Sequence, residues 1–245
     1  MKEQKDFKNS VERFFGRVEN YIKYRPHYPK EIIDFLRKEI ELDRSKVIAD
    51  IGSGPGISCE HFIEYGNKVF AVEPNKHMKN GAEKIFAGSK NFISINGTAE
   101  DTTLRSKTAD LIISGQAFHW FDKVKCKVEF QRILKSDGYV MLMWNLRDRK
   151  SGFMNEYEEL LIEYGKDYAN LYQDDVDAEE IANFFYPVIN KVKTFSNFQF
   201  LNYEALEGRM LSSSYIPLKE NPLYDKMIID LKNIFEKNNK EGKVW

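Results

Sequence analysis

The sequence predicts an α/β fold with a parallel, doubly wound sheet, and two observations support this prediction. A short apolar run rich in β-branched residues, Val47 to Ile51, breaks into three glycines at alternating positions before an apolar stripe at helical spacing begins. A run of this length suits a buried strand and is too short for a helix. The order of strand and helix then recurs until five strands have been met. Such alternation is typical of a parallel sheet with helices on its faces.

The predicted elements follow one another closely along the chain. The five strands are residues 47–51, 68–73, 92–95, 109–114 and 139–144. Helical stripes separate them, and Gly138 is expected to cap the last of these helices. After residue 146 the pattern changes to helices near 153–164, 181–188 and 224–235. In the same region residues 194–200 alternate like a strand, and 243–245 could begin another.

Composition limits the classes of partner that this chain can have. It holds 37 basic and 38 acidic residues, so no broad cationic surface recruits nucleic acid. No apolar run approaches the ~20 residues of a membrane span, and the N-terminus does not resemble a signal peptide. Cys59 and Cys126 lie far apart on apolar stripes, which favours buried thiols in a reducing compartment. We therefore expect a soluble cytoplasmic protein, a monomer or weak homodimer, with no nucleic-acid or membrane partner.

The glycine turn after the first strand suggests a nucleotide-type cofactor. Glycines permit positive φ and let a ligand lie against the backbone, and the following helix points its amide groups at that ligand. The dinucleotide fingerprint G-x-G-x-x-G fails, because its third glycine position holds Ile57. The pattern is D-x-G-x-G-x-G from Asp50, which resembles motif I of the class I S-adenosylmethionine-dependent methyltransferases. A tight turn with no ligand is the alternative.

Further segments extend the resemblance over about residues 10 to 245. Those that occur in the order and spacing of this family are ADIGSGPG, AVEPN, NGTAED, ISGQAFHWFD and QRILKSDGYVMLMWN. YRPHYP, QAFHW and GRMLSSSYIP resemble bacterial small-molecule members of the methyltransferase-11 type. The resemblance implies a Rossmann-like, seven-stranded sheet of order 3-2-1-4-5-7-6 with strand 7 antiparallel. The sequence departs from the family at this last strand, which normally runs further than Lys243-Val244-Trp245.

The resemblance also implies S-adenosyl-L-methionine as cofactor, S-adenosyl-L-homocysteine as product, and a set of binding residues. Glu73 stands 21 residues after Gly52, where a carboxylate can accept bonds from both ribose hydroxyls. In the NGTAED turn, a backbone amide would contact the adenine ring and an acid would accept from its amine. A solvated helix cap is the alternative there. The residues expected to bind the cofactor are Tyr21, Arg25, Asp50, Gly52, Gly54, Gly56, Glu73, Met78, Ala99, Glu100 and Gln116.

A candidate catalytic residue follows the fourth strand, whose carboxyl end opens onto the cofactor crevice of a doubly wound sheet. His119 has a side chain suited to general-base work on a phenol or amine, and a structural hydrogen bond from His119 to the backbone is the alternative. A carboxylate acceptor, already ionised at pH 7, needs no base. The four histidines show no metal-ligand spacing, so no metal is expected. Arg147 and Arg149 could pair an acidic substrate or lie in a solvated loop.

The chain is expected to form a single methyltransferase domain over residues 1–245. Residues 1–40 would be a helical N-terminal lid, and 146–190 a helical insert beside the substrate. An apolar stripe over residues 7–22 predicts the lid helix, which ends before Pro26, and Pro29 suits the first turn of the next helix. Arg25 would pair the methionine carboxylate of the cofactor. The alternatives to a lid are a rigid linker around Arg25 and an N-terminal helix that is permanently packed.

The best-supported function is therefore methyl transfer from S-adenosylmethionine to a small molecule, most simply O-methylation of a carboxylate. A non-catalytic binding module that keeps the fold is one alternative, and the intact acids at Asp50, Glu73 and Glu100 argue against it. A dinucleotide-dependent oxidoreductase is disfavoured by Ile57. Asn221-Pro222-Leu223-Tyr224 resembles a motif of amino-group methyltransferases, but that motif belongs just after strand four.

Overall fold

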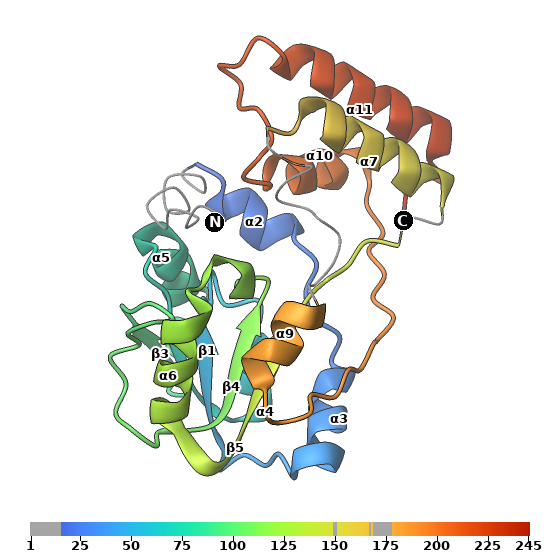
Figure 1. The fold of residues 1–245 in the computed structure, drawn as a ribbon. Helices are drawn as coiled ribbons and strands as arrows, with labels where there is room; N and C mark the ends of the chain where they lie inside the picture. The colour runs from blue at the N-terminus through green and yellow to red at the C-terminus, as the bar shows by residue number, and fades with distance from the viewer. Residues whose placement is uncertain (1–15, 149–150, 167, 169–177) are drawn as a thin grey trace. The chain divides into compact units, whose positions relative to one another are not determined.

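The chain divides into two compact units in the computed structural model, which describes residues 16–148, 151–166, 168 and 178–245 (Figure 1). Among these, the sheet unit comprises residues 27–145 and 178–196. The helical unit comprises residues 16–26, 146–148, 151–166, 168 and 197–245. The prediction of one domain with a lid and an insert stays a prediction, and most of the expected lid helix lies outside the described residues.

The sheet unit contains a parallel sheet, as the alternation of strands and helices predicts. Its strands are β1 (Val47–Ile51), β2 (Lys68–Val72), β3 (Phe92–Ile95), β4 (Ala109–Gly115) and β5 (Leu134–Met143). They lie in the order β3-β2-β1-β4-β5, and every neighbouring pair is parallel. The order reverses direction between β1 and β4, which places a topological switch point beside the glycine turn. The predicted α/β fold is confirmed in this respect.

The predicted seven-stranded sheet is wrong for the described residues, which form five strands. Residues 194–200 are irregular, and 243–245 contribute two isolated antiparallel bridges in the helical unit, from Val244 to Leu201 and from Lys243 to Lys240. The alternating phenylalanines misled the prediction, because Phe198 and Phe200 are 72% and 63% exposed. An alternating pattern stabilises a strand only where one face is buried against a core.

Helices cover both faces of the sheet in this unit (Figure 1). Alternate residues of β1 face opposite ways, so that Ile48 packs with α3 and α4 while Ala49 and Ile51 pack with α6 and α9. The buried cysteines Cys59 and Cys126 lie in these two opposite clusters, and neither forms a disulfide. The helices of the unit are α3 (Glu31–Ile40), α4 (Glu60–Tyr65), α5 (Lys76–Ile85), the 3₁₀ turn η1 (Phe118–Trp120), α6 (Lys123–Ile133) and α9 (Ala178–Phe185).

Gly138 does not cap α6, contrary to the prediction from its position. The helix ends at Ile133, and β5 begins at the next residue, so Gly138 lies inside the strand. The pairing with β4 shifts here, because Ala109 pairs with Leu134 whereas Leu111 pairs with Tyr139. A Cβ on Gly138 would come within 2.7 Å of the Leu134 side chain, so glycine accommodates this irregularity.

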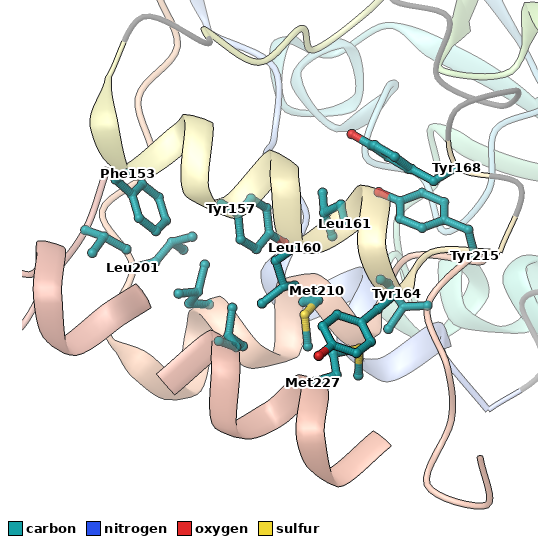
Figure 2. Packing of buried hydrophobic residues seen from close by; sticks show 14 residues of the cluster. Phe153, Tyr157, Leu160, Leu161, Tyr164, Tyr168, Leu201, Met210, Tyr215 and Met227 are labelled. Atoms are coloured by element: carbon teal, nitrogen blue, oxygen red, sulfur yellow. The ribbon is translucent and has the colours of Figure 1, made fainter. Parts of the chain in front are cut away.

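The helical unit has its own core, built from segments that are far apart in the sequence (Figure 2). It contains α2 (Val18–Tyr24), α7 (Gly152–Tyr164), α10 (Tyr203–Leu211) and α11 (Tyr224–Asn238). The sequence reasoning missed α10, whose first turn is capped by the Asn202 side chain accepting from the Ala205 amide. Gly208 within α10 allows the Tyr24 ring of α2 to approach the helix closely. No helix of the part that the structure describes is long and apolar enough to cross a membrane.

Arg17 holds the chain beyond α10 in place. Its guanidinium donates to the carbonyl oxygens of Leu211 at 2.8 Å, Ser213 at 2.7 Å and Ile216 at 2.6 Å. The residue is 4% exposed, and burial, followed by the charge of Arg25, lowers its pKa. The Leu211 carbonyl oxygen at the end of α10 has no partner within the helix, so Arg17 supplies its donor. The Ser213 carbonyl oxygen also accepts from the Ile216 amide, and Arg17 adds a charged donor to it.

Arg17→Met should destabilise the helical unit by about 2–4 kcal/mol, because three buried carbonyl oxygens lose a charged donor while the aliphatic part of the side chain is retained. Urea unfolding followed by circular dichroism measures this loss. Arg37→Met is the matched control, since Arg37 is exposed and pairs only locally with Asp34 in α3. It should cost less than about 0.5 kcal/mol. Equal unfolding midpoints for the two variants would contradict the role given to Arg17.

Candidate functional site

The glycine turn adopts the conformation that its sequence predicts. Gly52, Gly54 and Gly56 have φ values of 69°, 55° and 93°, a region that side chains with a Cβ rarely adopt. A Cβ at Gly52 would lie 2.7 Å from that of Ala117, and one at Gly56 would collide with the Phe86 ring. A Cβ at Gly54 would meet nothing within 4 Å. The outer glycines therefore permit close packing, whereas Gly54 leaves bare backbone open to a ligand.

Asp50 is a fully buried carboxylate at the end of β1. Its Oδ2 accepts a hydrogen bond of 2.5 Å from the Ser58 hydroxyl, while Oδ1 accepts none that meets ordinary geometry. Burial raises the pKa of Asp50 to about 7, opposed by Ser58 and the neighbouring Cys59 thiol and assisted by the negative charge of Glu73. The Ser53 hydroxyl is also buried without a hydrogen-bond partner. Unsatisfied polar atoms of this kind are costly and are typical of sites completed by a ligand.

Glu73 connects the end of β2 to the glycine turn. Its Oε2 accepts from the Gly54 amide at 2.9 Å, and its Oε1 accepts from the Asn75 amide at 2.7 Å. The side chain is almost fully buried, and burial raises its pKa against the effect of both amides. The structure thus brings together three of the predicted cofactor residues, Asp50, Gly54 and Glu73, at the carboxyl ends of β1 and β2.

The turns after β3 and β4 also reach this edge of the sheet. Ala99 is buried in the cluster that contains Phe118 and Phe121. Glu100 accepts from the Asp122 amide at 2.8 Å, so its carboxylate supports the start of α6. Gln116 has a positive φ of 55°, held by its amide donating to the Met143 carbonyl and its side chain donating to Asn145. A non-glycine residue in this conformation is strained, and such strain concentrates at functional sites.

The remaining predicted residues have different positions. Met78 is buried in the first turn of α5. His119 is exposed on η1, with its ring centroid 4.8 Å from that of Trp120. Tyr21 and Arg25 belong to the helical unit, where the Arg25 guanidinium lies over the Tyr21 ring and donates to the Ser213 hydroxyl. The cofactor role of Tyr21 and Arg25 and the catalytic role of His119 stay predictions.

Two residues of the site were missed from the sequence. Asn75 caps α5, accepting from the amides of His77 and Met78, while its own amide binds Glu73. An asparagine directly before a helical stripe is a recognisable cap, so this signal was present. Ser58, which donates to Asp50, gave no signal of its own in the sequence. Among the described residues no group of three or more His, Cys, Asp or Glu could hold a metal ion, and the absence of a metal stays a prediction.

Comparison with known proteins agrees with this geometry. The family described as "Methyltransferase domain" matches residues 49–142, which include the glycine turn, the segments that follow β2, β3 and β4, and β5 except for its last residue. The match supports a class I S-adenosylmethionine-dependent methyltransferase domain over these residues. The resemblance seen in the sequence is thereby confirmed, and the domain has the Rossmann-like fold expected of it.

The relatives themselves are mostly uncharacterized. A methyltransferase of Mycobacterium tuberculosis is 31% identical over 148 residues, 60% of this chain and 58% of that protein. A methyltransferase-like protein of Schizosaccharomyces pombe is 30% identical over 168 residues, 68% of this chain and 63% of that protein. The match thus spans about three fifths of each relative. A solved structure of a candidate S-adenosyl-L-methionine-dependent methyltransferase from Methanococcus maripaludis is similar to this chain, with a TM-score of 0.52 and 22% sequence identity. The similarity covers 75% of this chain and 84% of that protein, and it shows the fold alone.

Asp50→Asn should stabilise the protein without cofactor, and the gain should depend on pH. The carboxyl titrates near 3.8 when unfolded and near 7 when folded, so the folded state binds the extra proton between these values. Stability from this group is therefore present at low pH and is lost as pH rises through about 7. The neutral amide avoids that loss, which amounts to about 4 kcal/mol at pH 8.

Thermal melting of both proteins from pH 5 to 8 measures this effect. The variant should melt several degrees higher at pH 8, with a smaller difference at pH 5. Asp34→Asn is a matched control, because Asp34 is exposed on α3. Parallel melting curves for Asp50→Asn and wild type across this range would show that Asp50 does not carry the buried proton.

Proposed function

We propose that the protein is a methyltransferase (EC 2.1.1.-) that uses S-adenosylmethionine to methylate a small-molecule acceptor. O-methylation is the favoured reaction, with a carboxylate as the simplest acceptor. The observation that supports this most is the presence, at one edge of the sheet, of buried Asp50 with an unsatisfied oxygen and of Glu73 bonded to the Gly54 amide. The whole protein's activity is a proposal, since the curated relatives match over only part of their length.

The residues of the sheet unit fit the cofactor. When bound, S-adenosylmethionine supplies an electrophilic methyl group on a sulfonium. Glu73 uses one acceptor position on each oxygen for a backbone amide, and a carboxylate has about four such positions. It can therefore still accept from both hydroxyls of a ribose. Glu100 and the backbone at Ala99 would contact the adenine, and Gly54, Gln116 and Met78 would line the site.

Asp50 would respond to the positive charges of the cofactor. Nearby cationic groups favour the ionised form of a carboxyl group, which burial otherwise disfavours. Cofactor binding would thus lower the pKa of Asp50 and release a proton. The buried acid would distinguish the cationic methyl donor from neutral nucleosides, because only a cation compensates for its desolvated charge.

The acceptor chemistry follows from what the site offers. Holding the reacting atoms in line at ~3–3.5 Å can lower the activation barrier by ~7–11 kcal/mol. An acceptor that is already ionised therefore needs alignment and no general base. A carboxylate meets this condition at pH 7. For a phenol or amine acceptor, the exposed His119 on η1 after β4 would act as the general base.

The remaining parts of the proposal concern the whole chain. Residues 1–40 would act as a lid, with Tyr21 and Arg25 contacting the cofactor, and residues 146–190 would border the acceptor. The protein would work as a monomer or weak homodimer, without nucleic-acid or membrane partners. A cytoplasmic location is supported by the two buried thiols, which form no disulfide.

Calorimetry with S-adenosylhomocysteine should show micromolar-scale binding, because the site is built for the nucleoside and amino-acid parts that this product retains. Binding of a nicotinamide cofactor in its place would establish the oxidoreductase alternative instead. Transfer of radiolabelled methyl groups to a panel of small acids separates an enzyme from a binding module. Tight binding with no transfer to any acid, phenol or amine would support the non-catalytic module.

Glu73→Ala should weaken S-adenosylhomocysteine binding at least tenfold. The variant loses two charge-assisted hydrogen bonds to the ribose, each worth about 1.5–3 kcal/mol in mutational series. Calorimetry measures the change, and circular dichroism checks that the fold persists. Glu83→Ala, at a partly exposed position on α5, is the matched control and should bind as wild type does. An unchanged dissociation constant for Glu73→Ala would exclude Glu73 as the ribose ligand.

A further inference from the structure

The second half of the YRPHYP segment lies on the first turn of α4. The His27 Nδ1 atom stands 2.7 Å from each carboxylate oxygen of Glu60. His61 donates from Nε2 to the Tyr28 carbonyl oxygen at 2.7 Å. All four residues belong to the sheet unit. His27 and Tyr28 are therefore attached to the helix that follows the glycine turn.

The Tyr28 ring reaches the carboxyl end of β4. Tyr28 is 8% exposed and belongs to the apolar cluster that contains Ile113. A Cβ on Gly115, the last residue of β4, would lie 2.7 Å from the Tyr28 hydroxyl oxygen and 2.9 Å from the Ser58 Cβ. The φ angle of Gly115 is outside the left-handed region, so its backbone conformation does not require glycine. Tyr28 and Ser58 instead meet over this bare backbone, where a larger residue would push them away.

Ser58 connects this contact to the buried acid of the candidate site. It is almost fully buried, and its hydroxyl donates to the Asp50 carboxylate at 2.5 Å. Burial raises the pKa of Asp50, Ser58 and the Cys59 thiol lower it, and the charge of Glu73 adds to the rise. A donor favours the ionised form of a carboxyl group only while it is held at hydrogen-bond distance. Packing that fixes the Ser58 side chain therefore also affects the charge of Asp50.

We propose that Tyr28 is a positioning residue for Asp50, because it packs over Gly115 and holds Ser58 in the orientation that donates to the Asp50 carboxylate. His61 fixes the backbone of Tyr28 for this purpose. The role rests on the proposed function, in which ionised Asp50 faces the positive charges of the cofactor. The second half of the YRPHYP segment thereby serves the buried acid from within the sheet unit.

The pKa of Asp50 in the protein without cofactor tests this role. It is measured by NMR titration of isotopically labelled aspartate carboxyl groups, with the Asp50 signal assigned by its loss in Asp50→Asn. Ser58→Ala removes the donor and should raise this pKa from about 7 to about 8. Tyr28→Leu removes the packing partner of Ser58, and Gly115→Ala inserts a methyl group that displaces it, so each should raise the pKa about half as far. Tyr28→Phe keeps the ring and should restore most of the wild-type value.

Tyr65→Leu is the matched control, because Tyr65 packs against the same apolar cluster at the other end of α4. It loses the same ring but should leave the pKa of Asp50 unchanged, which separates general loosening of the sheet unit from loss of position. Binding of S-adenosylhomocysteine is the second measurement. Tyr28→Leu should bind it about twofold more weakly than wild type at pH 7 and equally at pH 9, where Asp50 is ionised in both proteins.

Three results would overturn the positioning role. These are a wild-type pKa of Asp50 in Tyr28→Leu, an equal rise of this pKa in Tyr65→Leu, and a loss of S-adenosylhomocysteine binding by Tyr28→Leu that is the same at pH 7 and pH 9. The pKa is measured without cofactor, so the first two results leave the proposed function intact. Failure of wild type to bind S-adenosylhomocysteine refutes the proposed function instead. If Gly115→Ala does not fold, Tyr28→Leu and Tyr28→Phe still decide the outcome.

Discussion

The hydrogen bond from the Gly54 amide to Glu73 is the constraint on which the candidate site depends. It joins the turn after β1 to the end of the neighbouring strand β2. Burial raises the pKa of the Glu73 carboxyl group, and this hydrogen bond opposes that effect. The second oxygen of Glu73 fixes the Asn75 amide, and Asn75 in turn caps α5. One buried side chain thereby sets the glycine turn, the strand end and the first turn of a helix relative to one another. A ligand placed against this edge meets a surface whose shape is already determined.

The buried acids define the electrostatic character of the same edge. Asp50 and Glu73 are both buried, and the charge of Glu73 adds to the effect of burial in raising the pKa of Asp50. Two buried acids without a neighbouring cation lower the stability of the folded protein. Natural proteins tolerate such a loss of stability at sites where function requires it. The strained backbone of Gln116 after β4 is a second local cost at the same edge. Both features lie at the topological switch point, where open α/β sheets bind their ligands.

Much of the sheet unit could be predicted from sequence, because its signals are local. A β-branched run ending in alternating glycines specifies a strand and a turn without reference to distant residues, and the acid at Glu73 follows at a characteristic spacing. Ser58 could not be predicted in this way, since its bond to Asp50 depends on how the turn folds back. Gly138 was misjudged for a similar reason. Gly138 lies at a shift in the pairing of β4 with β5. Such a shift involves two strands, so the residue pattern of one segment cannot predict it.

The region after β5 was harder to predict, because its signals depend on partners far away in the chain. The alternation of residues 194–200 indicated a strand, yet Phe198 and Phe200 find no buried face. The helix α10 was missed because Gly208 weakens its pattern, and the reason for that glycine is the Tyr24 ring some 180 residues earlier. Seven strands were expected from resemblance, and the described residues supply five.

The helical unit draws on three separate stretches of chain, and this affects the order of folding. Arg17 meets its carbonyl partners across 194 to 199 residues of sequence, nearly the whole length of the protein. Closing so long a loop costs more entropy than any contact within the sheet unit, so early formation of the sheet would shorten the effective distance to be closed. The contacts of Arg17 therefore form only after residues 211–216 have been synthesised.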